Sequence, residues 1–280
     1  MIRTYTLSAG TLRESALECA FPFLCDGRRH VIALTGGGGK TSLMFALARE
    51  FARRGRRTAV TTTTRIFRPT DGSACDSLEE CRACWDRGEY ATWGRDLPDD
   101  CEPDGLGRKS VDERQGIRRW VRAQPGKMSV LDEPEFDALL AAADVTLVEA
   151  DGARRMALKA PADHEPMIPA RADIVIGVAG LDVLGKPIAQ ACFRSELVAA
   201  LLGRGLDHAL TGEDVARVLR SERGARKGAG ERAYYMVLNK ADDAARRAQG
   251  EEILRLLGEN AVMTWFDEEE RPTLDTLAAL

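Results

Sequence analysis

The sequence has no hydrophobic run of the length that a membrane-spanning helix needs. No stretch approaches roughly 18 consecutive apolar residues. The first ten residues, MIRTYTLSAG, also lack the apolar core of a signal peptide. We therefore expect a cytoplasmic protein that has no membrane partner.

The chain also lacks a strong excess of charge of either sign, because its formal net charge is −4. Domains that bind nucleic acid usually carry a pronounced positive patch, and an anionic membrane surface attracts the same kind of patch. The charge balance therefore predicts no nucleic-acid partner.

Histidine is scarce, with three in the chain, and the seven cysteines are an odd number. An odd number of cysteines without a secretory signal argues against a disulfide framework and favours reduced thiols. Cys81 and Cys84 form a C-x-x-C pair between Cys75 and Cys101, and such thiols can ligate zinc. Because the spacing is irregular and no histidine lies nearby, we interpret them as loop thiols rather than as a metal site.

Apolar runs and helical stripes alternate along most of the 280 residues. We predict strands at 31–34, 58–64, 145–148, 174–178, 235–238 and 261–265, and helices at 11–21, 41–51, 136–143, 196–202 and 244–257. This alternation is typical of an α/β fold with a mostly parallel, doubly wound sheet. Proline and Asp-Gly pairs punctuate residues 68–135, which we interpret as an irregular or hairpin insertion, or cap, within one domain.

The segment HVIALTGGGGKTSLM, residues 30–44, resembles a phosphate-binding loop but departs from the usual G-x-x-x-x-G-K-[ST] pattern, which would need glycine at Leu34. A bare glycine run is more often a linker. Here, however, a buried strand precedes the glycines and a helix follows them, so the backbone N–H groups and the helix N-terminus face one point. We therefore predict phosphate binding, with Lys40 presenting its charge from an exposed loop. The predicted contacts are Gly36, Gly37, Gly38, Gly39, Lys40, Thr41 and Ser42.

Two carboxylates, Glu149 and Asp151, follow the predicted strand at 145–148. Ligands of open α/β sheets lie beyond the carboxyl ends of the strands, where a carboxylate can hold Mg²⁺ between phosphates. We expect Asp151 and the hydroxyl of Thr41 to bind Mg²⁺, and Glu149 to act through water. The alternative is that Asp151-Gly152 is only a turn.

The strand at 235–238 is followed by Asn239, Lys240 and Asp242, which match the N-K-x-D motif of GTP-binding proteins. In that motif the aspartate accepts hydrogen bonds from the guanine base. Its position downstream of a phosphate loop favours the same role here. The alternative is an Asx cap on the helix that begins near Asp242.

Basic residues follow the acidic pair and include Arg154, Arg155 and Lys159. They can hold a phosphate or a pterin-type cofactor, or they can pair with Asp163 and Glu165. His164 is the best acid/base candidate because imidazole titrates near neutrality, although a structural role is equally compatible with the sequence. The secondary candidates are Asp182, Lys186 and Arg194.

The glycine loop, TTTTRIF, VEADGARRMALKAPADHEP, GVAGLDVLGKP and LNKAD together resemble the YqeC family. Its members are described as accessory proteins for selenium-dependent molybdenum hydroxylases. They are similar in having a shortened loop, G-x-G-G-K-T, which residues 36–41 reproduce. The resemblance implies a P-loop NTPase-like fold and a role in maturing a selenium-containing cofactor.

Besides a nucleotidyl or phosphoryl transferase, two functions are compatible with these motifs. The first is a Mg²⁺-dependent NTPase that uses GTP, and its hydrolysis would time the insertion or activation of a selenium-modified molybdenum cofactor in a hydroxylase. The second is a carrier that binds a phosphate-bearing molybdopterin cofactor and delivers it without cleaving anything. Catalytic roles in the first function fall to Lys40, Glu149, Asp151 and His164.

Overall fold

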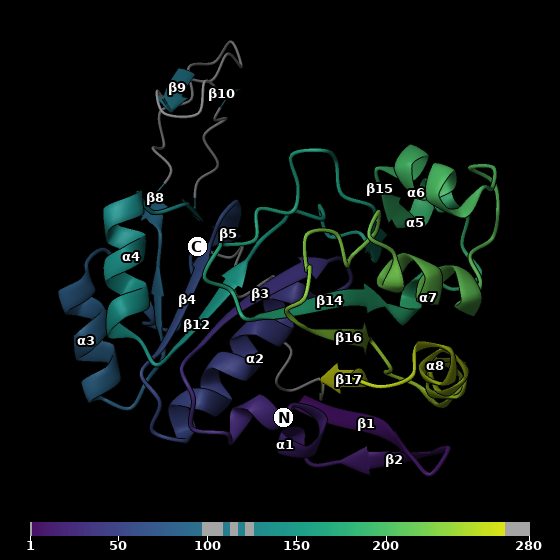
Figure 1. Cartoon of the computed structure of the whole chain (residues 1–280), viewed down its shortest axis with the longest axis horizontal. Coiled ribbons are helices and arrows are strands. Elements are labelled where there is room, and N and C mark those ends of the chain that lie inside the picture. Colours follow the sequence, from purple (N-terminus) through teal and green to yellow (C-terminus); the bar gives the residue numbers. More distant parts are fainter. Residues whose placement is uncertain (1, 97–108, 113–116, 121–125, 267–280) are drawn as a thin grey trace.

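A large central sheet organises the chain in the computed structural model, which describes residues 2–96, 109–112, 117–120 and 126–266. Within these residues, ten strands form the sheet (Figure 1). In spatial order they are β2 (Thr11–Ser15), β1 (Ile2–Ser8), β17 (Ala261–Phe266), β16 (Ala233–Asn239), β14 (Ile174–Gly180), β3 (His30–Gly36), β12 (Val145–Glu149), β4 (Thr58–Thr62), β7 (Ala91–Trp93) and β6 (Ala74–Cys75).

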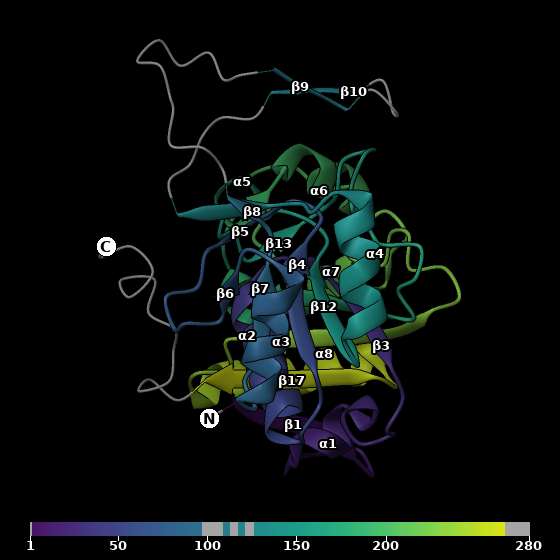
Figure 2. The same cartoon turned by 90° about the vertical axis from the view of Figure 1, so that its left-hand side faces the viewer.

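The strands from β17 to β6 run parallel, whereas β1 is antiparallel to β17 and β2 is antiparallel to β1. Figure 2 shows the N-terminal hairpin beside β17 at one edge of the molecule. The prediction of a mostly parallel sheet is confirmed, and the sheet is wider than expected. Because β3 lies between β12 and β14, the carboxyl ends of these three strands meet at one place.

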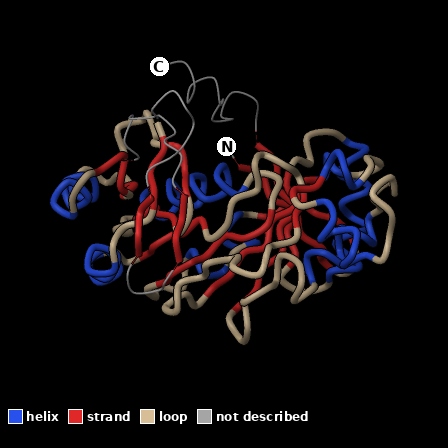
Figure 3. Tube along the Cα trace, turned by 90° about the horizontal axis from the view of Figure 1, so that it is seen from above, coloured by secondary structure: helices blue, strands red, loops and turns tan. Residues whose placement is uncertain are grey.

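Helices cover both faces of the sheet, and Figure 3 shows the strands running through the middle of the molecule with helices around them. One core contains Ile32 and Leu34 of β3 together with the apolar side of α2, whereas Ala33 belongs to the core on the opposite face. This alternation follows from the two-residue period of a strand. The helices are α1 (Leu17–Ala20), α2 (Lys40–Arg53), α3 (Leu78–Asp86), α4 (Glu133–Ala142), α5 (Ile188–Ala191), α6 (Ser195–Leu202), α7 (Gly212–Arg220) and α8 (Ala244–Leu257), with 3₁₀ turns η1 (Pro22–Leu24) and η2 (Leu181–Val183).

Small sheets accompany the central one. A three-stranded antiparallel sheet contains β5 (Arg65–Phe67), β11 (Lys127–Ser129) and β8 (Arg95–Asp96), and a parallel pair contains β13 (Leu158–Lys159) and β15 (Cys192–Phe193). Strands β9 (Lys109–Asp112) and β10 (Ile117–Trp120) form an antiparallel pair.

The prediction of a helix at 11–21 is wrong. Residues Thr11–Ser15 form β2 instead, and only Leu17–Ala20 are helical. The cause is the turn at Ala9 and Gly10, where φ is 50° and 77°, because positive φ at both central residues suits a tight hairpin. Hairpin pairing with β1, which we did not predict, overrides the capping pattern at Thr11.

The prediction of irregular or hairpin structure at 68–135 is wrong for a large part of that segment. Its strands β6 and β7 extend the central sheet, and α3 packs against β7. Helix α3 begins at an ordinary cap, since the Ser77 side chain accepts from the Glu80 N–H. Residues 97–108, 113–116 and 121–125 lie outside the described residues, and so does Cys101.

Candidate functional site

The glycine loop lies at the end of β3 and leads directly into α2. Gly36, Gly38 and Gly39 have φ values of 91°, 72° and 111°, which L-amino acids with side chains rarely adopt. The loop therefore has the backbone freedom that the sequence predicted.

Three N–H groups of the loop already bind protein acceptors. Gly36 N donates to Asp151 Oδ2 at 3.1 Å, Gly37 N to the Val178 carbonyl at 2.8 Å and Gly38 N to the Met156 carbonyl at 3.0 Å. Among the described residues, no acceptor is recorded for the N–H groups of residues 39–42. The backbone N–H groups with no recorded acceptor therefore lie at the end of the loop and in the first turn of α2, where an anion could accept from them.

Close packing explains why glycines occupy the loop. A Cβ atom on Gly38 would lie 2.1 Å from Gly180 N, and one on Gly36 would lie 2.3 Å from the Val178 carbonyl oxygen. A Cβ on Gly37 would similarly meet the Met156 carbonyl at 2.6 Å. The glycines thus let the loop approach β14 and the segment after β12.

Lys40 is buried, with 4% of its surface exposed, so the expectation that it extends from an exposed loop is wrong. Its Nζ donates to the Gly36 carbonyl at 2.6 Å and lies 3.1 Å from Asp151 Oδ1. Burial would lower the pKa of Lys40, but the charges of Asp151 and Glu149 outweigh burial and raise it. Lys40 is therefore a protonated cation within the protein.

Thr41 and Glu149 join α2 to the end of β12. Thr41 Oγ1 donates to Glu149 Oε2 at 2.8 Å. Burial raises the pKa of Glu149, outweighing the charge of Lys40 and this hydrogen bond. A hydroxyl and a carboxylate side by side are oxygen ligands of the kind that Mg²⁺ prefers.

Asp151 has a different position from the one that we predicted for a magnesium ligand. It lies between two lysines, 3.1 Å from Lys40 Nζ and 3.1 Å from Lys159 Nζ, and accepts from Gly36 N. The structure thus places Glu149, rather than Asp151, beside the hydroxyl of Thr41. The alternative of a mere Asp-Gly turn does not account for the buried ion pairs of Asp151.

Lys159 continues this buried network. Its Nζ donates to Glu165 Oε2 at 2.8 Å, and Arg194 also donates to the Glu165 carboxylate. Burial would raise the pKa of Glu165, but hydrogen bonds from Arg194 and Lys159 outweigh it and lower the pKa to about 2. Pairing with Glu165, one of the alternatives for the basic cluster, is thus the observed arrangement of Lys159.

The remaining candidates are exposed or half-buried. His164 has no recorded contact with the other described site residues, and Lys186 is also exposed. Ser42, in the first turn of α2, is half-buried. The acid/base role of His164 therefore stays a prediction from the sequence.

The N-K-x-D segment touches the glycine loop. Asn239 Nδ2 donates to the Gly38 carbonyl at 3.0 Å, and Asn239 Oδ1 accepts from Thr264 Oγ1 at 3.0 Å. Lys240 Nζ donates to Asp182 Oδ2 at 2.7 Å. The motif therefore supports the loop from the side of β16.

Asp242 does not cap the helix that follows it. The cap of α8 is Asp243, whose side chain accepts from the Arg246 N–H, whereas Asp242 Oδ2 accepts from the Arg246 guanidinium at 3.2 Å. The Asx-cap alternative is therefore correct for the neighbouring residue and wrong for Asp242.

Arg154 and Arg155 are exposed and lie in the turn after Asp151. The Arg154 guanidinium carbon is 5.3 Å from the centre of the Phe193 ring, and that of Arg155 is 5.6 Å from the centre of the Phe67 ring. Sequence reasoning missed both phenylalanines. Their only signal was position, since Phe67 ends the TTTTRIF segment and Phe193 precedes Arg194.

The cysteines of the C-x-x-C segment lie in a hydrophobic core rather than in loops. Cys75, Cys81 and Cys84 are buried, and Cys75 Sγ is 3.6 Å from Cys84 Sγ. Burial raises the pKa of the Cys84 thiol to about 11. In the part of the chain that the structure describes, no group of three or more histidine, cysteine or carboxylate side chains is arranged to hold a metal ion. The cysteines in that part, Cys19, Cys25, Cys75, Cys81, Cys84 and Cys192, are free thiols.

Comparison with known proteins identifies the family. The model of the family described as YqeC protein matches residues 32–196, more than half of the 280 residues. This chain belongs to the YqeC family. It is also 31% identical over 255 residues to "Uncharacterized protein YqeC" of Escherichia coli (strain K12), a match that covers 88% of this chain and 91% of the relative.

The matched region contains most of the site. It includes the glycine loop, both carboxylates after β12 and the arginines up to Arg194, but it stops before Asn239. No helix among the described residues is both long and apolar enough to cross a membrane.

Proposed function

We propose that this YqeC family protein is a P-loop NTPase-like protein that binds a Mg²⁺–nucleotide complex, with GTP preferred. The observation that carries the proposal is the hydrogen bond between Thr41 and Glu149, 2.8 Å long, beside a buried lysine at the start of α2. Oxygen ligands, a lysine and a helix N-terminus together are what a nucleotide phosphate and its metal need.

The residues present fit the proposed ligand. Glu149 is 7% exposed, and burial of its carboxylate favours the protonated form. A divalent cation beside it would favour the ionised form, because an opposite charge stabilises a buried carboxylate. Thr41 and Glu149 would hold Mg²⁺, and the N–H groups of residues 39–42 would hold phosphate oxygens together with Lys40.

Bound Mg²⁺ would supply charge neutralisation between the phosphates. The protein's own contribution is positioning. Asn239 fixes the Gly38 carbonyl, and Asp151 holds Lys40 against the Gly36 carbonyl. Asp242, after the same strand as Asn239, would accept from guanine.

We further propose that nucleotide binding serves the maturation of a selenium-containing molybdenum cofactor for a hydroxylase. This role is supported by the family resemblance of the loop and of the segment after β12. The delivered ligand would be a molybdopterin-type cofactor.

Calorimetry of GTP binding with and without Mg²⁺ tests the binding proposal. We expect Mg²⁺ to tighten binding to wild type and to Thr41→Ser, but not to Thr41→Val, which keeps the shape of threonine without its hydroxyl. Wild-type protein that binds GTP equally well with and without Mg²⁺ would exclude the metal site. Release of inorganic phosphate from GTP would distinguish a protein that hydrolyses the nucleotide from a carrier that does not.

The maturation role needs a separate test. A selenium-dependent molybdenum hydroxylase should be produced in cells that contain wild-type protein, Thr41→Ser, Thr41→Val or none. We expect full hydroxylase activity with the first two and a marked loss with the last two. Equal activity in all four would exclude the maturation role while leaving nucleotide binding intact.

A further inference from the structure

Two consecutive arginines in the turn after Asp151 adopt backbone conformations that are uncommon for residues with side chains. Arg154 has φ 48° and Arg155 has φ 64°. Residues held in this region need support from their surroundings, and they cluster at sites that bind ligands. We call residues 152–156 the arginine turn.

Both ends of the arginine turn are tied to the candidate nucleotide site. At its start, the Gly152 carbonyl accepts from Lys159 Nζ at 2.6 Å. At its end, the Met156 carbonyl accepts from Gly38 N of the glycine loop at 3.0 Å. The two arginines therefore lie on a short segment whose position is fixed relative to the loop.

The arginine turn lies between the three-stranded sheet of β5, β11 and β8 and the parallel pair of β13 and β15. Arg154 lies over Phe193 of β15, and Arg155 lies over Phe67 of β5. Each ring has a second cation near it, because Arg194 lies 4.8 Å from the Phe193 centre and Lys127 lies 4.7 Å from the Phe67 centre. Contact between guanidinium and ring faces leaves the N–H edges of the arginines available for an anion.

The charge around the turn is unbalanced. The nearby carboxylates are already engaged, since Glu149 accepts from Thr41, Asp151 lies between Lys40 and Lys159, and Glu165 accepts from Lys159 and Arg194. Among the described residues, no carboxylate is recorded as a partner of Arg154 or Arg155. Two consecutive arginines, each with a second cation beside the same aromatic ring, thus give the arginine turn a local positive charge in a chain of net charge −4.

We propose that the arginine turn binds the phosphate of a second substrate, a phosphomonoester, that occupies the site together with the nucleotide. A phosphomonoester carries close to two negative charges at neutral pH, and its oxygens match the paired N–H groups of arginine. Carboxylates carry one charge and would leave the arginine pair half neutralised. This inference rests on the proposed nucleotide site, which would supply the other reactant.

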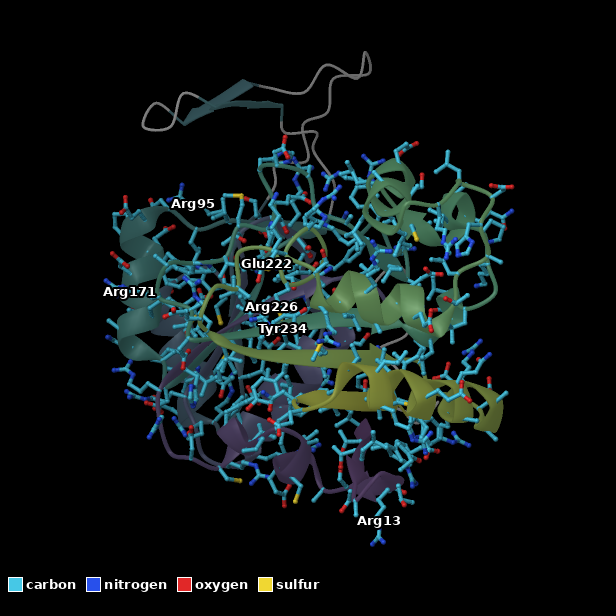
Figure 4. The ribbon with its side chains drawn as sticks, turned by 45° about the vertical axis from the view of Figure 1, so that its right-hand side comes forward. Arg13, Arg95, Arg171, Glu222, Arg226 and Tyr234 are labelled. Atoms are coloured by element: carbon cyan, nitrogen blue, oxygen red, sulfur yellow. The ribbon has the colours of Figure 1, made fainter. Side chains whose placement is uncertain are left out.

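The test uses riboflavin 5′-phosphate as a fluorescent phosphomonoester and riboflavin as the matched probe without phosphate. Both are titrated into the full chain, first alone and then with a saturating non-hydrolysable GTP analogue and Mg²⁺. The variant is Arg154→Gln/Arg155→Gln. Its control is Arg13→Gln/Arg171→Gln, which removes the same charge from two exposed arginines that Figure 4 shows at the periphery of the molecule.

We expect wild type and the control to bind riboflavin 5′-phosphate, with the analogue present, at least about tenfold more tightly than the arginine-turn variant does. GTP affinity should be alike in all three proteins. The proposal is overturned if the variant binds the phosphate probe as well as wild type does, if riboflavin binds equally well, or if no arginine-dependent binding occurs at about millimolar probe.

The two proposals fail in different ways. If wild type binds the phosphate probe through the arginines but binds no GTP, phosphate binding by the arginine turn stands, whereas the nucleotide proposal and the pairing of two substrates fall. If the arginine-turn variant loses GTP and probe affinity together, the arginines serve the phosphates of the nucleotide itself, and the second-substrate site is excluded. Circular dichroism of each variant checks that the fold is retained.

Discussion

Thr41 Oγ1 donates a hydrogen bond to Glu149 Oε2 at 2.8 Å, so that the first turn of α2 and the carboxyl end of β12 share one contact. The two residues are 108 positions apart in the chain. Their contact depends on β12 lying directly beside β3, with Glu149 opposite Leu34 in the parallel register. Sheet order therefore creates the proposed metal site.

The first prediction concerns the Glu149 carboxylate. Glu149→Gln keeps the shape of the side chain but removes the charge that a cation needs, so Mg²⁺ should no longer tighten GTP binding. We expect the free energy of GTP binding, measured by calorimetry, to weaken by about 1.5 to 3 kcal/mol in the presence of Mg²⁺ and to change little without it. Equal losses under both conditions would show that Glu149 acts only through packing.

The same carboxylate predicts a pH dependence. Because burial raises the pKa of Glu149 and Mg²⁺ binds the ionised form, Mg²⁺ affinity should increase with pH until the carboxyl group is fully ionised. In Glu149→Gln this part of the pH dependence should be absent.

A second prediction concerns the buried pair of Lys40 and Asp151. Lys40→Met should lower the free energy of unfolding by up to about 3 kcal/mol, because it leaves a buried carboxylate with one cation fewer. Lys40→Met/Asp151→Asn should be less destabilised than the sum of the single variants, with a coupling of about 1 to 3 kcal/mol in urea denaturation. Additive effects would contradict a direct interaction.

The matched control for this double-mutant cycle is an exposed ion pair. Arg226 Nε donates to Glu222 Oε1 at 2.9 Å, and both residues are labelled in Figure 4. Their side chains are 40% and 63% exposed, so solvent screens the interaction. The corresponding Arg226→Met/Glu222→Gln cycle should give a coupling below about 0.5 kcal/mol.

A third prediction compares two glycines with the same backbone angle. Gly38 has φ +72° and would place a Cβ atom 2.1 Å from Gly180 N, whereas Gly55 has φ +73° and nothing within 4 Å. Gly55→Ala should therefore lower the free energy of unfolding only by the backbone strain, about 1 to 2 kcal/mol. Gly38→Ala should lower the stability clearly more, as measured by thermal denaturation. Equal losses of stability in the two variants would argue against close contact between the loop and β14.

A fourth prediction concerns His30, at the start of β3. Its Nδ1 lies 2.6 Å from Asp173 Oδ2, and its Nε2 lies 3.0 Å from Asp26. The hydrogen bond with Asp173 raises the pKa of His30 above 6.5, although burial opposes it. The resulting stability is fully present below pH 6.5 and is lost as pH rises through the higher pKa of the folded state.

Urea denaturation of wild type and His30→Gln across neutral pH measures this effect. The difference in free energy of unfolding between the two proteins should shrink as pH rises. A difference that is constant with pH would show that folding does not shift the pKa of His30.

A fifth prediction concerns base recognition. If Asp242 accepts from guanine, wild type should prefer GTP over ATP, by about 1 to 3 kcal/mol for each polar group left unsatisfied. Asp242→Asn should shift the preference from GTP toward XTP, because the amide N–H suits the second carbonyl of xanthine. Competition titrations with GTP, ATP and XTP measure both effects.

Asp243 provides the neighbouring control. Its carboxylate caps α8 by accepting from the Arg246 N–H, and asparagine caps helices about as well as aspartate. Asp243→Asn should therefore leave base preference unchanged. If both variants alter the preference alike, the effect comes from general loss of negative charge rather than from a contact with the base.

Local patterns in the sequence were sufficient to predict the central elements of the fold. The apolar run at Val31 to Leu34 lies within β3, and the helix predicted at 244–257 is α8. The helix predicted at 11–21 was wrong because a tight turn at Ala9 and Gly10 let Thr11–Ser15 pair with β1. Pairing between strands depends on residues outside the local window, which propensity does not include.

The sequence was sufficient to predict those site residues that directly follow a strand. Glu149 and Asp151 were both expected at the loop, but their partners depend on the path of the chain after β12. That path brings Lys159 back to Asp151 and places Glu149 beside Thr41. No spacing rule indicates this exchange of roles, because the contacts join residues on separate elements.

The edge of the sheet also constrains how the protein is made. Ile2 in β1 pairs with Phe266 in β17, so this strand leaves the ribosome long before its neighbour, which lies 264 positions later in the chain, has been synthesised. At ordinary rates of translation the N-terminal hairpin waits on the order of ten seconds or more without that neighbour. During this interval it exposes unpaired backbone groups, and a chaperone that shields strand edges would act on it at this stage.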